Sequence, residues 1–169
     1  FMLAPMNSQA QFAPIGVDIE CQQSTININV HPEQNDPVSV SCTVTNTGSV
    51  KEQIDIDWSV DGNDFNIDVQ GDKSWDIEAG DSEDFTAVFT ASPRIEVKSE
   101  DFNITATVVS ATIGGEPLTV PLGQFGSTAE IGGTVNSLGY SRMDLEVSNP
   151  TTRNIEVSEE ANIQFTIFN

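Results

Sequence analysis

The chain has 169 residues, which is enough for one large domain or for one domain and part of a second. It carries 26 Asp and Glu against 6 Lys and Arg, a formal net charge of −20. This balance argues against nucleic acid and anionic membranes as partners, because both are bound by clustered Lys and Arg. It fits a salty or divalent-rich medium, or simply a well-solvated surface.

Residues 1–14 are apolar, are interrupted by Pro5 and Pro14, and are too short to cross a bilayer. No other apolar stretch approaches that length, so we expect no membrane span. Ser8-Gln9-Ala10 resembles the small-residue end of a secretory signal whose basic start is missing. The other interpretation is a mature, extended N-terminal arm that docks elsewhere. Its anchors on a neighbouring subunit would be Phe1, Met2, Leu3, Met6, Phe12 and Ile15.

Apolar and polar residues alternate along most of the chain, which predicts strands with one buried face. Polar or Gly-containing turns separate these runs, and no window shows a helical period. Residues 38–60 hold the clearest pair of runs, joined by Asn46-Thr47-Gly48-Ser49, which predicts a β-hairpin or two neighbouring strands of a sandwich. Roughly eight short strands at near-regular spacing indicate an all-β Greek-key β-sandwich. The expected strands are 17–21, 25–30, 38–45, 54–60, 65–70, 75–77, 85–90 and 101–110.

Cys21 and Cys42, the two cysteines, each fall in an expected strand. In an oxidising compartment they would form a disulfide that joins these strands. The alternative is two buried free thiols in a cytosolic protein. A metal site built from both cysteines and His31 lacks a fourth ligand.

Three stretches in order, CTVTNTGSVKEQIDI, EAGDSEDFTAVFTAS and DFNITATVVSA, resemble the CARDB-type immunoglobulin-like domains of archaeal and bacterial surface proteins. The resemblance covers about residues 15–113. It implies an immunoglobulin-like or jelly-roll-type sandwich used as a spacer, adhesin or assembly unit. The NTGSV stretch is also similar to camelysin-like secreted fibre proteins, whose subunits donate a strand to a neighbour.

Residues 114–169 begin at a boundary, Gly114-Gly115-Glu116-Pro117, and are rich in Gly until Tyr140. They are too few for a separate sandwich. We expect them to extend or complete the first domain's sheets, with alternating strands at 118–122, 143–147, 155–157 and 161–168.

The acidic turns are candidates for calcium. Asp57, Ser59, Asp61 and Asp68 match loop positions 1, 3, 5 and 12 of a calcium loop, with Gly62 at position 6. Three features depart from that pattern: Asp64 stands at position 8, Asp replaces Glu at position 12, and no helices are expected on either side. The alternative is an Asp-Gly turn with solvated carboxylates; Asp81, Glu83 and Asp84 form a second candidate group. No other cofactor is expected.

Asn103-Ile104-Thr105 is an acceptor sequence for glycosylation, and Asn103 should point outward if its neighbours point in. Trp58 and Trp75 are expected to fill the core, with a carbohydrate-binding platform as the alternative. His31 has no Ser or Cys motif beside it, and no pair of carboxylates stands out as that of a glycosidase. We therefore expect no catalytic residues and no enzyme.

These features lead to two functional expectations, whereas a third, a calcium-dependent hydrolase, would require a cleft of convergent carboxylates that the sequence does not show. The first is an extracellular structural subunit of a filament, pilus or surface layer, a homopolymer that assembles by strand exchange through the N-terminal arm. The second is an adhesion, carbohydrate-binding or protein-binding module of a cell-surface protein.

Overall fold

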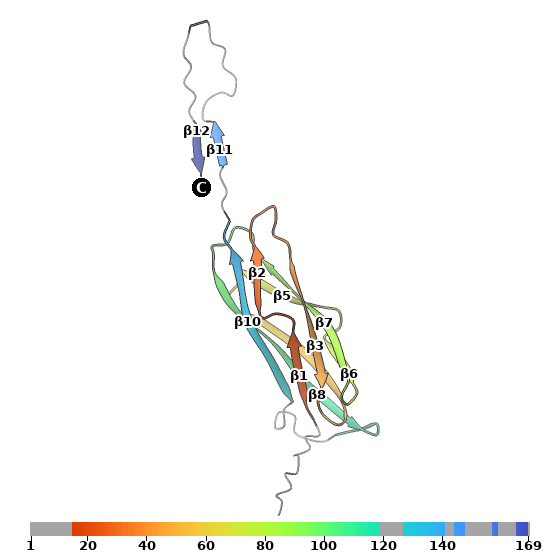
Figure 1. Ribbon diagram of the computed structural model, residues 1–169. Helices are drawn as coiled ribbons and strands as arrows, with labels where there is room; N and C mark the ends of the chain where they lie inside the picture. The colour runs from red at the N-terminus through yellow and green to blue at the C-terminus, as the bar shows by residue number, and fades with distance from the viewer. Residues whose placement is uncertain (1–14, 119–126, 141–143, 148–156, 159–164, 169) are drawn as a thin grey trace, which may run out of the picture. The chain divides into compact units, whose positions relative to one another are not determined.

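The computed structural model describes residues 15–118, 127–140, 144–147, 157–158 and 165–168 (Figure 1). The chain divides into two units, Phe1–Leu138 and Gly139–Asn169. The N-terminal arm, with Phe1, Met2, Leu3, Met6 and Phe12, lies outside the described residues, so its anchoring role stays a prediction.

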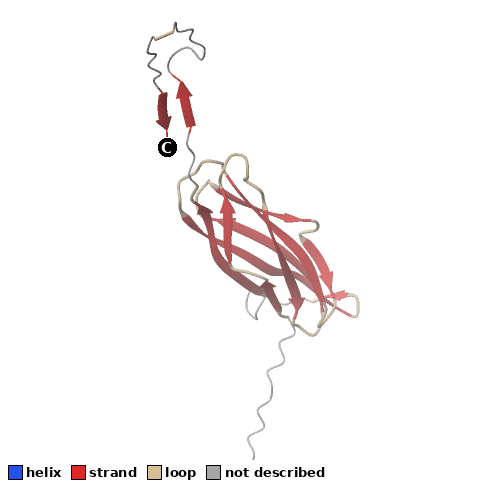
Figure 2. Ribbon diagram, turned by 45° about the horizontal axis from the view of Figure 1, so that its top comes forward, coloured by secondary structure: helices blue, strands red, loops and turns tan. Residues whose placement is uncertain are grey.

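The first unit is an all-β, immunoglobulin-like sandwich of two sheets, and its described residues form strands and loops only (Figure 2). Sheet A has four strands in the order β1-β3-β7-β5, all antiparallel. Its strands are β1 (Val17–Cys21), β3 (Val38–Asn46), β7 (Ser82–Ala91) and β5 (Phe65–Gln70).

Sheet B has the order β2-β10-β8-β4-β6, with the short β9 added beside β8. Its pairs are antiparallel except β2 and β10, which run parallel. Its strands are β2 (Thr25–Asn29), β10 (Thr128–Leu138), β8 (Ser99–Ile113), β4 (Lys51–Val60), β6 (Ser74–Ile77) and β9 (Glu116–Pro117).

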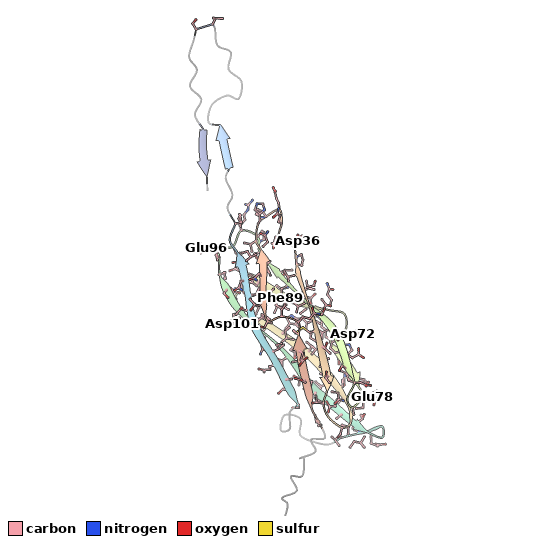
Figure 3. All side chains as sticks on the ribbon, in the orientation of Figure 1. Asp36, Asp72, Glu78, Phe89, Glu96 and Asp101 are labelled. Carbon is pink, nitrogen blue, oxygen red and sulfur yellow. A yellow bond between two sulfur atoms is a disulfide. The ribbon has the colours of Figure 1, made fainter. Side chains whose placement is uncertain are left out.

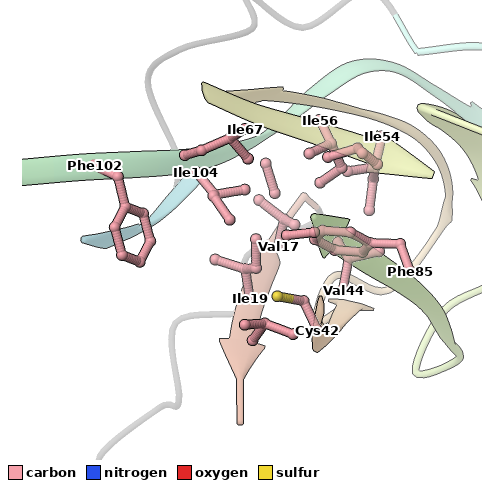
Figure 4. Close-up of a cluster of buried hydrophobic side chains, with 14 of the residues drawn as sticks. Val17, Ile19, Cys42, Val44, Ile54, Ile56, Ile67, Phe85, Phe102 and Ile104 are labelled. Atoms are coloured by element: carbon pink, nitrogen blue, oxygen red, sulfur yellow. The ribbon is translucent and has the colours of Figure 1, made fainter. Parts of the chain in front are cut away.

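The core lies between the sheets and consists of the apolar halves of the alternating strands (Figure 4). Val44, Ile54 and Ile104 are 0% exposed. Burying one such side chain stabilises the fold by about 1.5–3 kcal/mol. The acidic residues labelled in Figure 3 project outward, whereas Phe89 lies between the sheets. The sandwich is thus held by an Ile-, Val- and Phe-rich interior beneath an acidic exterior.

The strands differ from the sequence-based expectations at three points. Consecutive strands β3 and β4 belong to opposite sheets, so of the two alternatives for residues 38–60 the β-hairpin is wrong and two strands of a sandwich are confirmed. Val157 and Ser158 form a turn where the end of a strand was expected. Strand β10 was missed because Gly132-Gly133 interrupts its alternation, yet it pairs with both β8 and β2. Most of the strand expected at 118–122 lies outside the described residues.

The second unit contains a two-stranded antiparallel sheet of β11 (Asp144–Val147) and β12 (Phe165–Phe168). These strands fall within the expected strands 143–147 and 161–168. Their register places Leu145 opposite Ile167 and Val147 opposite Phe165.

Candidate functional site

The two cysteines form a disulfide, as the sequence predicts. Cys21 and Cys42 are directly opposite each other on β1 and β3, with Sγ atoms 2.03 Å apart. The bond joins two residues that are 21 positions apart in the sequence. It ties β1, one of the two edge strands of sheet A, to its neighbour β3. A disulfide of this kind is typical of proteins that fold in an oxidising compartment.

A shallow groove of about 470 Å³ lies on the outer face of sheet A, beside the disulfide. Glu20, Thr43 and Asp84 form one row across β1, β3 and β7, and the Thr43 hydroxyl donates to Asp84 Oδ1 at 2.6 Å. The other polar residues of the lining are Gln22, Ser41 and Thr86. The groove therefore offers hydroxyls, an amide and two carboxylates, which suit hydrogen bonding to a polar ligand.

The residues predicted to bind calcium are not brought together. Asp57, Ser59 and Asp61 lie on β4 or just after it in sheet B, whereas Asp68 lies on β5 in sheet A. The Asp68 carboxylate pairs with Lys73 at 3.6 Å. Within the described ranges, no three His, Cys, Asp or Glu side chains are grouped closely enough to hold a metal ion, and this includes Asp81, Glu83 and Asp84. The alternative of an ordinary Asp-Gly turn fits this geometry, with Gly62 at φ +76°.

Asn103 lies on β8 in register with Ser59 of β4 and Gly132 of β10. Its neighbours Phe102 and Ile104 are buried while Asn103 is half-buried, so Asn103 faces outward as expected. Its Oδ1 is buried without a hydrogen-bond partner. Whether a glycan is attached stays a prediction.

Both tryptophans pack against the core, and Trp58 has a further contact that sequence reasoning missed. Its indole N–H donates to the main-chain oxygen of Ile67 on β5 at 2.8 Å. The Lys73 ammonium lies 4.4 Å from the centroid of the Trp58 ring. Trp58 thus joins sheet B to β5, the other edge strand of sheet A, and cation–π attraction holds Lys73 over the Trp58 ring.

A second missed cluster fixes the Asp61–Asp64 turn. The Lys98 ammonium lies between the carboxylates of Asp64 and Glu100. Its hydrogen bonds to these carboxylates raise the pKa of Lys98, and the bond to Asp64 has the larger effect. A side chain on Gly62 would clash with the Glu100 carboxylate. No hydrophobic pattern signals this cluster, since it depends on a turn and a strand that are distant in sequence.

The third missed cluster holds residues 15–16 at the point where they enter the fold. Ile15, which we expected to anchor the arm on a neighbouring subunit, is instead 2% exposed and packs in the core of its own sandwich. The N–H of Gly16 donates to Glu52 Oε1 at 3.0 Å, and its carbonyl accepts from Thr47 N at 2.8 Å and Gly48 N at 3.1 Å. Glu52 is fully buried and its Oε2 has no partner, so burial raises the pKa of this carboxyl. The chain is therefore anchored firmly just after residue 14.

Comparisons with known proteins give a fold likeness and no family. No protein-family model and no curated protein matches the sequence. The chain is similar to part of native α-2-macroglobulin from Escherichia coli, at 13% identity and a TM-score of 0.47, over 80% of this chain and 18% of that one. It thus spans less than a fifth of the macroglobulin chain.

Two further solved structures are similar at 12% identity and a TM-score of 0.39. One is an ASH/PapD-like domain of human CEP192, over 84% of this chain and 95% of that one. The other is from a chaperone–tip adhesin complex of CFA/I fimbriae biogenesis, over 89% and 81%. Similarities of this size carry no inference about activity or partners. Among the described residues, no helix is long and apolar enough to cross a membrane.

Proposed function

We propose that this protein is a structural subunit of an extracellular filament, pilus or surface layer, and that subunits assemble by strand exchange. The observation that carries the proposal is the distribution of charge. No Asp, Glu, Lys or Arg occurs before Asp18, so all 26 acidic residues lie at position 18 or later. A subunit of charge −20 repels its copies, and an uncharged apolar segment is the part that another copy accepts at least electrostatic cost.

The anchoring of residues 15–16 supports the same proposal. Three hydrogen bonds on Gly16 and the burial of Ile15 fix the point at which residues 1–14 join the fold. A segment that links two subunits needs such an anchor, because tension between subunits would otherwise pull the first residues out of the fold.

The second unit also supports assembly. Among its described residues this unit has two paired strands and no third, and an isolated pair of strands is marginal in water. The paired positions Leu145–Ile167 and Val147–Phe165 are apolar. The disulfide fits an oxidising, extracellular location. The CARDB-type resemblance remains part of the proposal, as does the absence of enzymatic activity.

The test is negative-stain microscopy of the native protein with and without residues 1–14. Filaments or sheets that vanish on deletion are the expected result. Uniform monomers in both samples, at physiological salt, would contradict the proposal.

A second candidate function is a binding module, and the groove on sheet A favours it. Its row of Glu20, Thr43 and Asp84 would bind a ligand rich in hydrogen-bond donors. Screening a glycan and peptide panel against the wild-type chain and Asp84→Ala tests this function. Binding that is lost in the variant, by a protein that stays monomeric, would favour the module over the filament.

A further inference from the structure

Strand β10 has an uncovered half. Its neighbour β2 pairs with Thr134–Leu138 alone. Along residues 128–133, β10 pairs with β8 on one side and, within the described part of the chain, has no hydrogen-bonded strand on the other; β1 of sheet A lies near β10 without pairing with it. We call Thr128–Gly133 the β10 edge.

Two main-chain hydrogen bonds at the ends of the β10 edge fix which of its main-chain groups point away from β8. Val108 N donates to Ser127 O on the β8 side, and Thr134 N donates to Ser24 O on the β2 side, both at 2.8 Å. Because successive residues of a strand point their N–H and C=O in opposite directions, Ala129 and Ile131 bond β8. Thr128, Glu130 and Gly132 therefore direct their N–H and C=O away from β8, toward the uncovered side.

The apolar cover of the core is also incomplete here. Ile104 and Ala106 on the central strand β8 are 0% exposed. Their partners in register, Ile131 and Ala129, pack against the same core yet stay partly exposed. An added strand would cover these two side chains while its main chain pairs with β10.

The other strand edges each have an outward group that is occupied, carry a charged pair, or leave no core surface to bury. On β5 the Ile67 carbonyl is taken by Trp58, and on β1 the Ile19 N–H donates to the Asp18 carboxylate at 3.0 Å. Asp76 on β6 forms an ion pair with Lys51, which places charges along that edge. On β2 the inward residues Ile26 and Ile28 are 0% exposed, so no core surface is left to bury.

We propose that the β10 edge is the acceptor site for residues 1–14 of a second copy, an inference that rests on the proposed strand exchange. This segment adds main-chain hydrogen bonds and apolar side chains without bringing a charge near Glu130. Six residues of β10 span about 20 Å, which an extended segment of fourteen residues covers with length to spare for the link between subunits.

The experiment adds a synthetic peptide with the sequence of residues 1–14 to the isotopically labelled, monomeric full chain and follows amide exchange by NMR. Exchange should slow about tenfold or more at Thr128, Glu130 and Gly132, and change little at Ala129 and Ile131. Glu130→Pro removes one outward N–H and should weaken peptide binding about tenfold. Asn27→Pro is the matched control, because Asn27 directs its N–H outward from β2; it should bind the peptide as the wild type does.

Several outcomes overturn the assignment: protection along β2 or β5 in place of β10, no protection at all, or equal weakening by both proline variants. Slow exchange of the three outward amides in the dilute monomer before any peptide is added would mean that the chain's own first residues occupy the edge, which also overturns it. Filaments that leave the β10 edge exchanging would refute the acceptor and keep the proposed function. A peptide that protects the β10 edge of a protein that never polymerises would support the acceptor site and refute the proposed function.

Discussion

Trp58 of sheet B donates its indole N–H to the main-chain oxygen of Ile67, across the open side of the sandwich, at 2.8 Å. A side chain of sheet B thereby occupies the main-chain carbonyl of Ile67, which points outward from β5, an edge strand of sheet A. An unpaired edge invites another strand, and this contact removes one of the groups on which such pairing depends.

Trp58→Phe should therefore destabilise the fold and promote unspecific association along β5. It leaves the Ile67 carbonyl without its donor and weakens the attraction for Lys73, at a cost of about 1–2 kcal/mol. Urea unfolding and light scattering measure the two effects. Trp75→Phe is the control, because Trp75 packs on Phe85 at 5.9 Å between ring centroids and has no such edge contact. Equal scattering from both variants would contradict the edge-closing role.

Glu52→Gln should stabilise the protein at neutral pH. Burial raises the pKa of Glu52 above its ordinary value of 4.5, so the folded state favours the protonated carboxyl. Its contribution to stability is full below about pH 4.5 and is lost as the pH rises through the raised folded pKa. The variant keeps the Gly16 acceptor without the charge, so its advantage should shrink on acidification.

Urea midpoints of wild type and Glu52→Gln at pH 4, 5.5 and 7, at constant salt, measure this effect. Comparing the two proteins at each pH removes the general relief of repulsion as the other carboxylates are protonated. A difference that is constant across the series would show that Glu52 does not titrate in this range.

Gly133→Ala should be strongly destabilising and Gly132→Ala nearly neutral, although the two residues are adjacent on β10. A Cβ on Gly133 would lie 2.1 Å from the Ser24 carbonyl oxygen and 2.7 Å from the Phe102 ring. On Gly132 its nearest atom would be Phe102 O at 3.5 Å, an ordinary contact. Losses of about 2–4 kcal/mol and under about 1 kcal/mol are expected in chemical unfolding. Similar losses for both would contradict the described packing of β2 against β10.

Replacing both cysteines by alanine should lower stability by about 3 kcal/mol, the value for a closed loop of this length. The reason is that the oxidised unfolded chain has fewer conformations. Thermal unfolding of the wild type with and without reductant gives a parallel measurement. Insensitivity to both treatments would indicate that β1 is held by its pairing with β3 alone.

Local sequence was sufficient for the strands of sheet A and for most of sheet B. Strict alternation, as in Val40, Cys42 and Val44, makes one face of a strand apolar wherever it lies in the fold, so it can be recognised in the sequence. The same alternation placed Cys21 and Cys42 in strands. Because the chain has two cysteines, a disulfide within it can join only this pair, whatever the order of the strands. An outward Asn103 followed from the same periodicity.

Strand β10 shows the limit of predicting strands from the alternation of apolar and polar residues. Its interruption, Gly132-Gly133, exists because Phe102 and Ser24 approach β10 too closely for a side chain at residue 133. In the sequence alone, glycine at this position indicates a loop, and only the neighbouring strands show that it belongs to a strand. Likewise, Asp57 and Asp68 have the spacing of a calcium loop but lie in opposite sheets, since the intervening turn carries the chain from one sheet to the other.

The sequence by itself thus determined the fold class, the disulfide and the contrast between an uncharged beginning and an acidic remainder, because each depends on residue type and periodicity. Only the tertiary structure decided which main-chain groups at strand edges are occupied, by Trp58 on β5 and Asp18 on β1, and which half of β10 lacks a second hydrogen-bonded strand. Those features depend on which strands become neighbours, and that is set by the packing of the whole core.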